Sequence, residues 1–250
     1  MSEVFFKSIS SGSRGNCAVL WDSSDLIIID FGISYRRFRN ATDSFLPEGL
    51  NTSAFVSHEH SDHSSGLKTL KSKHEVDVYT RKLTGERIGI DFYPMERETI
   101  IGNFTITPVE VPHDAADPVV YVIRNGEAKI CVVSDLGFAP AGLATAIEGS
   151  DILAVEANHD VSMLKEGPYD PWLKKRILGD RGHLSNEQSA DLISSTVGPE
   201  SRIVLLHLSE KNNTPDLALN HVTSSLANRE IHYSSIECAT QDQGSSLYRI

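Results

Sequence analysis

Four short apolar segments of this chain each run directly into a histidine or an acid, and this pattern constrains the fold more than any other feature. The segments end at Val56, just before "SHEHSDH", and within "VEVPHD", "CVVSD" and "IVLLHLS". Their length and composition predict β-strands. Strand ends collect at one rim of an α/β fold, where functional sites are built. We therefore expect His58, His113, Asp135 and His207 to meet in space.

The rest of the chain alternates apolar runs with turn and helix signals. The Gly-Asn pair at 102–103 and the Asn-Gly pair at 125–126 predict hairpins. Ser185 and Gln188 have the spacing of a capping box, and Thr214 precedes a proline at the start of an expected helix. Hairpins come first, followed by alternating helices and strands. This order indicates two mixed sheets packed together with helices outside, an α/β sandwich.

Length and composition favour one globular domain. The chain has 250 residues, 40% of them hydrophobic, and no repeat or linker-like segment, so we expect a single domain over 1–250. No apolar run is long enough for a membrane span, and the acid at position 3 argues against a signal peptide. Cys17, Cys131 and Cys238 have no paired spacing, which favours free thiols in a reducing compartment. We therefore expect a cytoplasmic protein.

The net charge of −11 disfavours broad binding to nucleic acid, which requires a basic surface. Two local stretches are basic, unlike the chain as a whole. Residues 172–185 contain four basic side chains and one aspartate, and "YRRFR" at 35–39 contains three basic side chains. Each stretch is either a solvated helix face or a contact surface for an anionic substrate.

The sequence "HEHSDH" at 58–63 indicates a metal site. Side chains two apart on an extended segment point the same way, so His58 and His60 can converge. Asp62 and His63 lie on the turn that follows and can face the same space, whereas Glu59 points away. Nitrogen and oxygen ligands suit zinc, manganese or iron. The alternative is an exposed polar loop that contains histidines by chance.

Several motifs together resemble those of the metallo-β-lactamase-fold hydrolases. They are "GSRGN", "IDFG", "HEHSDH", "SDLG" and "LLHLS", in this order over the full chain. The sequence is most similar to the YycJ/VicX-type branch, through "SGSRGNCAVL", "HDAADPVVYV" and "GHLSNEQSA". The resemblance implies a four-layer αββα sandwich and nuclease-type activity. It also implies two divalent metal ions, with His58, His60 and His113 on the first, Asp62, His63 and His207 on the second, and Asp135 bridging them.

This chain differs from members of the superfamily in two respects, and both differences narrow the expected activity. Lactamase members have a cysteine where this chain has Asp135, which favours a phosphoesterase-like site with two metals. The chain also lacks the large inserted domain of RNA-processing relatives and the long arm with which ribonuclease Z holds transfer RNA. Transfer-RNA processing is therefore not expected.

Further residues are candidates for catalysis and substrate binding. His183 in "GHLSN" is similar to a catalytic histidine of ribonuclease Z-like enzymes and is expected to be a general acid or a phosphate contact. Asp62 is expected to accept or pass the proton of an attacking water. Asn158 and His159 are expected to contact substrate or support the ligands, or else to form a simple turn. Asp30 in "IDFG" is expected to brace the metal-binding loops.

These expectations lead to a metal-dependent phosphodiesterase of nuclease type, expected to be a DNA exonuclease that uses a water activated by the metals. Its substrate partner would be nucleic acid, and no membrane is involved. The acidic net charge favours an alternative, a small-molecule hydrolase of the same fold that acts on a cyclic phosphodiester or a thioester. A third reading is a regulatory partner protein without enzymatic activity. The intact ligand set argues against it.

Overall fold

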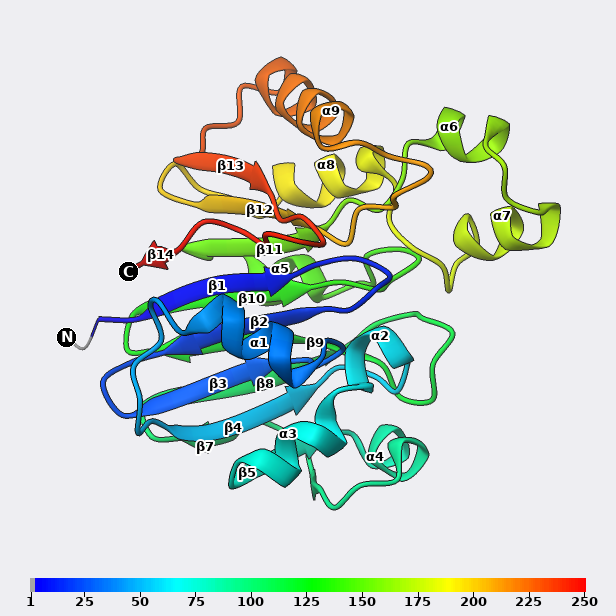
Figure 1. The fold of residues 1–250 in the computed structure, drawn as a ribbon. Helices are drawn as coiled ribbons and strands as arrows, with labels where there is room; N and C mark the ends of the chain where they lie inside the picture. The colour runs from blue at the N-terminus through cyan, green and yellow to red at the C-terminus, as the bar shows by residue number, and fades with distance from the viewer. Residues whose placement is uncertain (1–2) are drawn as a thin grey trace.

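The computed structural model describes residues 3–250 and contains two seven-stranded sheets that face each other (Figure 1). The strand order of the first sheet is β14 (Tyr248–Arg249), β1 (Phe5–Ser10), β2 (Cys17–Trp21), β3 (Asp25–Ile29), β4 (Asn51–Val56), β5 (Val76–Thr80) and β6 (Tyr93–Pro94). The order of the second is β13 (Ser235–Cys238), β12 (Arg202–Leu206), β11 (Ile152–Glu156), β10 (Ala128–Val133), β9 (Val119–Asn125), β8 (Phe104–Glu110) and β7 (Thr99–Ile101).

Each sheet starts with antiparallel hairpins and continues with parallel strands. β1, β2 and β3 pair antiparallel, and β3 to β6 are parallel; β7 to β10 pair antiparallel, and β10 to β13 are parallel. Parallel neighbours need crossover connections, and helices supply most of them. These helices are α1 (Tyr35–Thr42), α2 (Ser61–Ser64), α3 (Leu67–Lys73), α4 (Lys82–Ile88), α5 (Leu143–Ile147), α6 (Val161–Glu166), α7 (Pro171–Ile177), α8 (Asn186–Ser194) and α9 (Pro215–Asn228).

Three separate apolar clusters define the layers of the molecule. Ile27 and Ile29 of β3 belong to the cluster between the two sheets, whereas Ile28 packs with residues of α1 and α3 on the outer face. This alternation follows from the two-residue period of a strand. On the second sheet, α5, α8 and α9 supply Leu143, Ile193 and Val222 to the outer cluster. The predicted αββα sandwich is therefore confirmed.

Most of the predicted element boundaries are also confirmed. Ser185 and Gln188 form both hydrogen bonds of a capping box at the start of α8, and Thr214 caps α9. The segment 230–239 is rich in apolar and aromatic residues, as expected of a strand, but β13 covers only part of it. Only residues 235–238 pair with β12, because Glu230 has a positive φ of 57° and ends the turn after α9.

Helices α6 and α7 project from the end of the sandwich at which the parallel strands finish (Figure 1). We call residues 161–177 the α6–α7 arm. Among residues 3–250, no helix combines the length and the hydropathy that a membrane crossing requires.

Candidate metal centre

The structure brings all seven predicted ligands together at one end of the sandwich. His58 and His60 lie between β4 and α2, α2 contributes Asp62 and His63, and the other three predicted ligands, His113, Asp135 and His207, follow the ends of β8, β10 and β12. Their nitrogen and oxygen atoms form groups in which all atoms lie within 4.8 Å of one another, and each group could hold a metal ion. The groups are His58–His60–His113, Asp62–His63–His207, His58–His63–Asp135 and Asp135–Glu156–His183–His207.

Three imidazole nitrogens face one another in the first group. His58 Nε2 lies 3.1 Å from His60 Nδ1, and His113 Nε2 lies 3.3 Å from the same atom. His113 Nδ1 is 3.1 Å from the carbonyl oxygen of Gly182, which can only accept, so Nδ1 carries the proton and Nε2 has a lone pair. Two nitrogens on a tetrahedral zinc ion would be about 3.3 Å apart. The spacing therefore suits a shared cation.

Asp135 lies between the two groups of ligands. Its Oδ2 is 3.2 Å from His63 Nε2, and its Oδ1 is 3.9 Å from His113 Nε2. Asp62 Oδ2 lies 3.5 Å from the Nε2 atoms of both His63 and His207. Within residues 3–250, Asp135 Oδ2 and His207 Nε2 are buried and form no hydrogen bond. Buried polar atoms are rarely left unpaired, so these two atoms fit metal coordination.

The electrostatics of these groups also fit a bound cation. Burial lowers the pKa of His63, but the neighbouring Asp135 and Asp30 carboxylates outweigh this and raise it well above its usual value. Burial raises the pKa of Asp135, but His207 and His63 hold it well below its usual range. A ligand must lose its proton to bind metal, so a metal ion would replace the positive charge that the proton supplies here.

Asp30 contacts the predicted ligand His63 on the side of the ring that faces away from Asp135, which agrees with its predicted supporting role. Its Oδ2 lies 2.8 Å from His63 Nδ1, and its Oδ1 accepts a 2.8 Å hydrogen bond from the backbone N–H of Ser57. The first contact directs His63 Nε2 towards Asp135. Contacts of this kind fix the orientation of a metal-binding ring.

Glu156 is the residue of this site that the sequence analysis missed. It ends β11, is fully buried, and lies 2.8 Å from His183 Nδ1 and 3.0 Å from His207 Nδ1 through Oε1. Burial raises the pKa of Glu156, but the attraction of His183 outweighs it and lowers the pKa to about 2. The signal was present, because "DILAVE" is an apolar strand that ends in an acid, like the strands before the other ligands.

Comparison with known proteins shows the family of this chain. Residues 27–208 match the family model described as a beta-lactamase superfamily domain. The chain belongs to the metallo-β-lactamase superfamily. It is 32% identical over 248 residues to "Exodeoxyribonuclease WalJ" of Streptococcus pneumoniae, and the match covers 92% of each of the two chains. It is also 32% identical over 240 residues to "Exodeoxyribonuclease YycJ" of Bacillus anthracis, and that match covers 89% of each chain.

Solved structures show the same fold at low sequence identity. The metallo-β-lactamase fold protein YhfI from Bacillus subtilis has a TM-score of 0.74 and 14% identity, with 100% of both chains covered. The short form of human tRNase Z has a TM-score of 0.63 and 15% identity, with 97% of this chain and 98% of that chain covered. Membership of the superfamily, together with the two named bacterial relatives, makes this chain a metal-dependent hydrolase.

The other predicted site residues lie around the predicted ligands and differ in exposure to solvent. His183 is partly accessible, with 13% of its side chain exposed, and its ring centroid is 5.2 Å from those of His113 and His207. Asn158 is buried and donates a 2.8 Å hydrogen bond to the backbone oxygen of His207. His159 is buried, neither of its ring nitrogens has a partner among the residues that the structure describes, and burial lowers its pKa to about 4. The substrate role of Asn158 and His159 stays a prediction.

The backbone is strained where three of these residues leave their strands. Asp30, Asp135 and His207 have φ values of 58°, 62° and 54°, in the left-handed region. Each such residue costs on the order of 1–3 kcal/mol, and strain of this kind clusters at functional sites. The strands thus turn sharply where their last side chains must reach the centre.

The Gly-rich loop at 11–16 braces α2. Asn16 donates its backbone N–H to the carbonyl oxygen of Asp62 at 2.7 Å, and its side-chain nitrogen lies 2.9 Å from His63 Nε2. Gly32 packs against the same turn, and a Cβ at this position would lie 1.7 Å from the Asp62 carbonyl oxygen. The motifs "GSRGN" and "IDFG" therefore hold the "HEHSDH" turn in place.

Gly32→Ala is expected to reduce metal affinity by at least about 10-fold, because the methyl group must displace the backbone that carries Asp62 and His63. Metal titration of the purified variant measures this loss. Gly198→Ala is a control, since Gly198 has open space around its Cβ position and does not adopt a left-handed backbone conformation. Unchanged affinity in Gly32→Ala would show that the turn does not depend on this contact.

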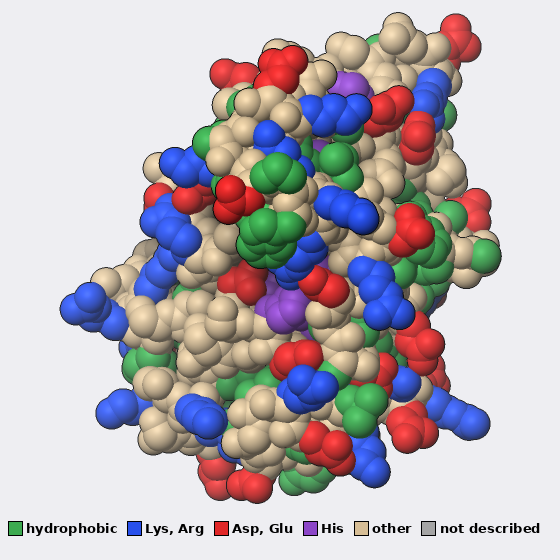
Figure 2. All heavy atoms as spheres, turned by 90° about the vertical axis from the view of Figure 1, so that its right-hand side faces the viewer, with side chains coloured by type: hydrophobic (Ala, Val, Ile, Leu, Met, Phe, Trp, Pro, Cys, Tyr) green, Lys and Arg blue, Asp and Glu red, His purple; other side chains and the backbone are tan. Residues whose placement is uncertain are grey.

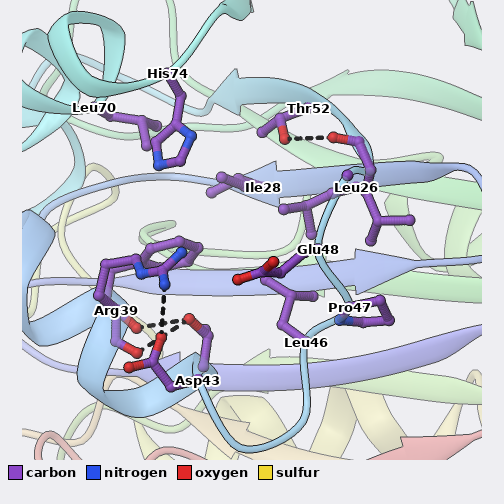
Figure 3. A pocket seen from close by; sticks show the side chains of 14 residues that line it. Leu26, Ile28, Arg39, Asp43, Leu46, Pro47, Glu48, Thr52, Leu70 and His74 are labelled. Atoms are coloured by element: carbon purple, nitrogen blue, oxygen red, sulfur yellow. Dashed lines mark hydrogen bonds and ion pairs between the residues drawn. The ribbon is translucent and has the colours of Figure 1, made fainter.

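A separate pocket lies on the outer face of the first sheet, between α1 and α3 (Figure 3). Its volume is about 270 Å³, and Leu26 and Ile28 of β3 line it together with a 3.0 Å ion pair between Arg39 and Asp43. It contains none of the predicted ligands, so it is not part of the metal centre.

Proposed function

We propose that this chain is a nuclease that hydrolyses phosphodiester bonds of DNA from an end, with two divalent ions of zinc, manganese or iron. The observation that carries this proposal is the pair of ligand groups joined by Asp135, in a chain 32% identical to proteins named as exodeoxyribonucleases. His58, His60 and His113 would hold one ion, Asp62, His63 and His207 the other, and Asp135 would contact both.

The charge of this centre favours an anionic substrate. Two divalent ions bring four positive charges, and the carboxylates of Asp62 and Asp135 cancel two of them. When bound, the ions supply activation of a water molecule and stabilisation of negative charge on the phosphate oxygens. A phosphodiester suits this site better than a neutral ester.

Two side chains are placed to move protons. Asp62 is 21% exposed and can accept the proton of an attacking water. Glu156 fixes His183 through Nδ1, so the Nε2 atom of His183 is the one that can hold a proton for the leaving oxygen. The backbone N–H of His183 also donates to the Ile177 carbonyl oxygen at 3.1 Å, which fixes the position of the residue below α7.

His183→Ala is expected to keep the metal content but to lower kcat on DNA by about 10²- to 10⁴-fold, the usual contribution of a general acid. Bis(p-nitrophenyl) phosphate is the matched substrate, because its leaving group needs no proton. The variant should therefore lose much less activity on it than on DNA. Loss of metal from His183→Ala would contradict the assigned role.

The alternative is a hydrolase of small molecules, which the net charge of −11 favours. A panel of labelled duplex DNA, single-stranded DNA, RNA, bis(p-nitrophenyl) phosphate and a thioester, each with Mn²⁺ or Zn²⁺, separates the two. We expect cleavage of linear DNA and no cleavage of covalently closed circles. Turnover of the generic diester without cleavage of any polynucleotide would reject the nuclease. The cytoplasmic location stays a prediction.

A further inference from the structure

The α6–α7 arm is anchored at the accessible edge of the metal centre. Most of the predicted ligands are buried, but His60 is 31% exposed and Asp62 is 21% exposed. Arg176 of α7 pairs with Asp114, with 3.0 Å between Nη2 and Oδ1. Asp114 Oδ1 lies 3.3 Å from His113 Nε2 and 4.0 Å from His60 Nε2. A substrate that reaches the accessible ligands therefore passes beside α7.

The arm carries a large aromatic side chain that the fold does not bury. Trp172 is 66% exposed, although burying an indole normally stabilises a protein. Trp172, Lys175 and Arg176 are three and four residues apart on α7, which places them on one face of the helix. Since Arg176 points to the edge of the metal centre, this face of α7 borders the same opening.

The charge around Trp172 differs from that of the whole molecule. Residues 172–185 carry four basic side chains and one acid, in a chain with a net charge of −11. Among the described residues, the side chains of Lys174 and Arg176 have partners within the protein, whereas no hydrogen bond or ion pair of the Lys175 side chain is found. Figure 2 shows this end of the molecule, with histidine at its centre and hydrophobic and basic side chains beside it.

The arm is held rigidly enough to position a ligand. Lys174 Nζ donates to the Lys165 carbonyl oxygen at 2.7 Å, which ties α7 to α6. A Cβ at Gly182 would lie 2.0 Å from the Ile177 carbonyl oxygen, so the segment before His183 packs closely against the end of α7. Helix α7 is therefore packed against the segment that carries His183.

We propose that Trp172 and Lys175 form a binding surface for a single-stranded segment of the nucleic-acid substrate, next to the phosphate that is cleaved. The indole stacks on an unpaired base, and the Lys175 ammonium group contacts a backbone phosphate. A duplex hides its base faces, so this surface selects a single strand or a frayed end over an intact duplex. The inference rests on the proposed nuclease function.

Kinetics of the metal-loaded full chain test this surface. Trp172→Ala is expected to raise KM for a single-stranded oligonucleotide about 5- to 150-fold, the range for loss of one base-stacking contact. Trp172→Phe should stay near the wild type, because phenylalanine can still stack. Leu178→Ala, which removes another exposed apolar side chain at the end of α7, should change nothing. Turnover of bis(p-nitrophenyl) phosphate should be equal in all four proteins.

Three outcomes would overturn the proposal in different ways. Cleavage of DNA with an unchanged KM in Trp172→Ala rejects the surface and leaves the nuclease intact. Cleavage of the generic diester but of no polynucleotide rejects both. If sedimentation shows that Trp172→Ala converts a dimer into a monomer, without a change in KM, the surface binds a second copy of the chain instead.

Discussion

Asp135→Asn is expected to lower turnover of every phosphodiester substrate by at least about 100-fold and to reduce the amount of bound metal. The substitution keeps the size of the side chain but removes a negative charge and one carboxylate oxygen. Asp135 lies within 3.2 Å of His63 and 3.9 Å of His113, so it is the group that contacts both sets of ligands. Changes even to residues that only support a metal ligand cost about 10- to 100-fold, and a direct ligand should cost more.

Asp22→Asn is the matched control for this variant. Asp22 is also a buried aspartate, and it accepts hydrogen bonds from the backbone N–H groups of Ser24 and Asp25 at the turn before β3, away from the ligands. The Asp22→Asn substitution can lower the free energy of unfolding, but it should leave the metal content per folded chain unchanged. Equal metal loss in both variants would show that general unfolding, and not ligand loss, explains the result for Asp135.

Glu156→Gln is expected to reduce metal affinity and kcat by about 10- to 100-fold. The carboxylate of Glu156 accepts from two imidazoles and from the backbone N–H of Leu184 at 3.1 Å. An amide of the same shape presents N–H hydrogens where an acceptor is needed, so His183 and His207 lose their fixed orientation. Metal titration and single-turnover cleavage measure the two effects separately.

Glu110→Gln gives the same change of charge at an exposed position and should behave as the wild type. If Glu156→Gln kept full metal affinity and full activity, the orientation of His183 and His207 would not depend on this residue. If Glu156→Gln lost activity but kept normal metal affinity, Glu156 would act only by orienting His183 and not by orienting His207.

That the predicted ligands lie close together could be expected partly from local rules. A strand that ends in a histidine or an acid delivers that side chain to the rim of the sheet, and "HEHSDH" after β4 adds four candidate ligands in six residues. The hairpins and the capping box at Ser185 are equally local signals. Strand patterns and turn chemistry were therefore enough to expect two packed sheets with helices outside, whereas the four-layer αββα order and the grouping of the seven ligands came from the resemblance to metallo-β-lactamase-fold hydrolases.

The supporting contacts could not be predicted because they join segments far apart in the chain. Asn16 contacts a turn 46 residues away, and Gly32 is needed only because the Asp62 carbonyl oxygen lies against it. Asn158 and His159 attracted attention as polar residues after a strand, but Glu156 at the strand end makes the contacts to His183 and His207. The place of α7 next to the predicted ligands depends on the pairing of Arg176 with Asp114, which no local pattern reveals.

The metal content of the active protein tests the central claim most directly. The chain is dialysed against Mn²⁺ or Zn²⁺, freed of loosely bound ions and analysed by elemental mass spectrometry beside Asp135→Asn and Asp22→Asn. We expect two ions per wild-type chain, the same number in Asp22→Asn, and a clear loss in Asp135→Asn. Wild-type protein that hydrolyses phosphodiesters while it holds no transition metal would contradict the account.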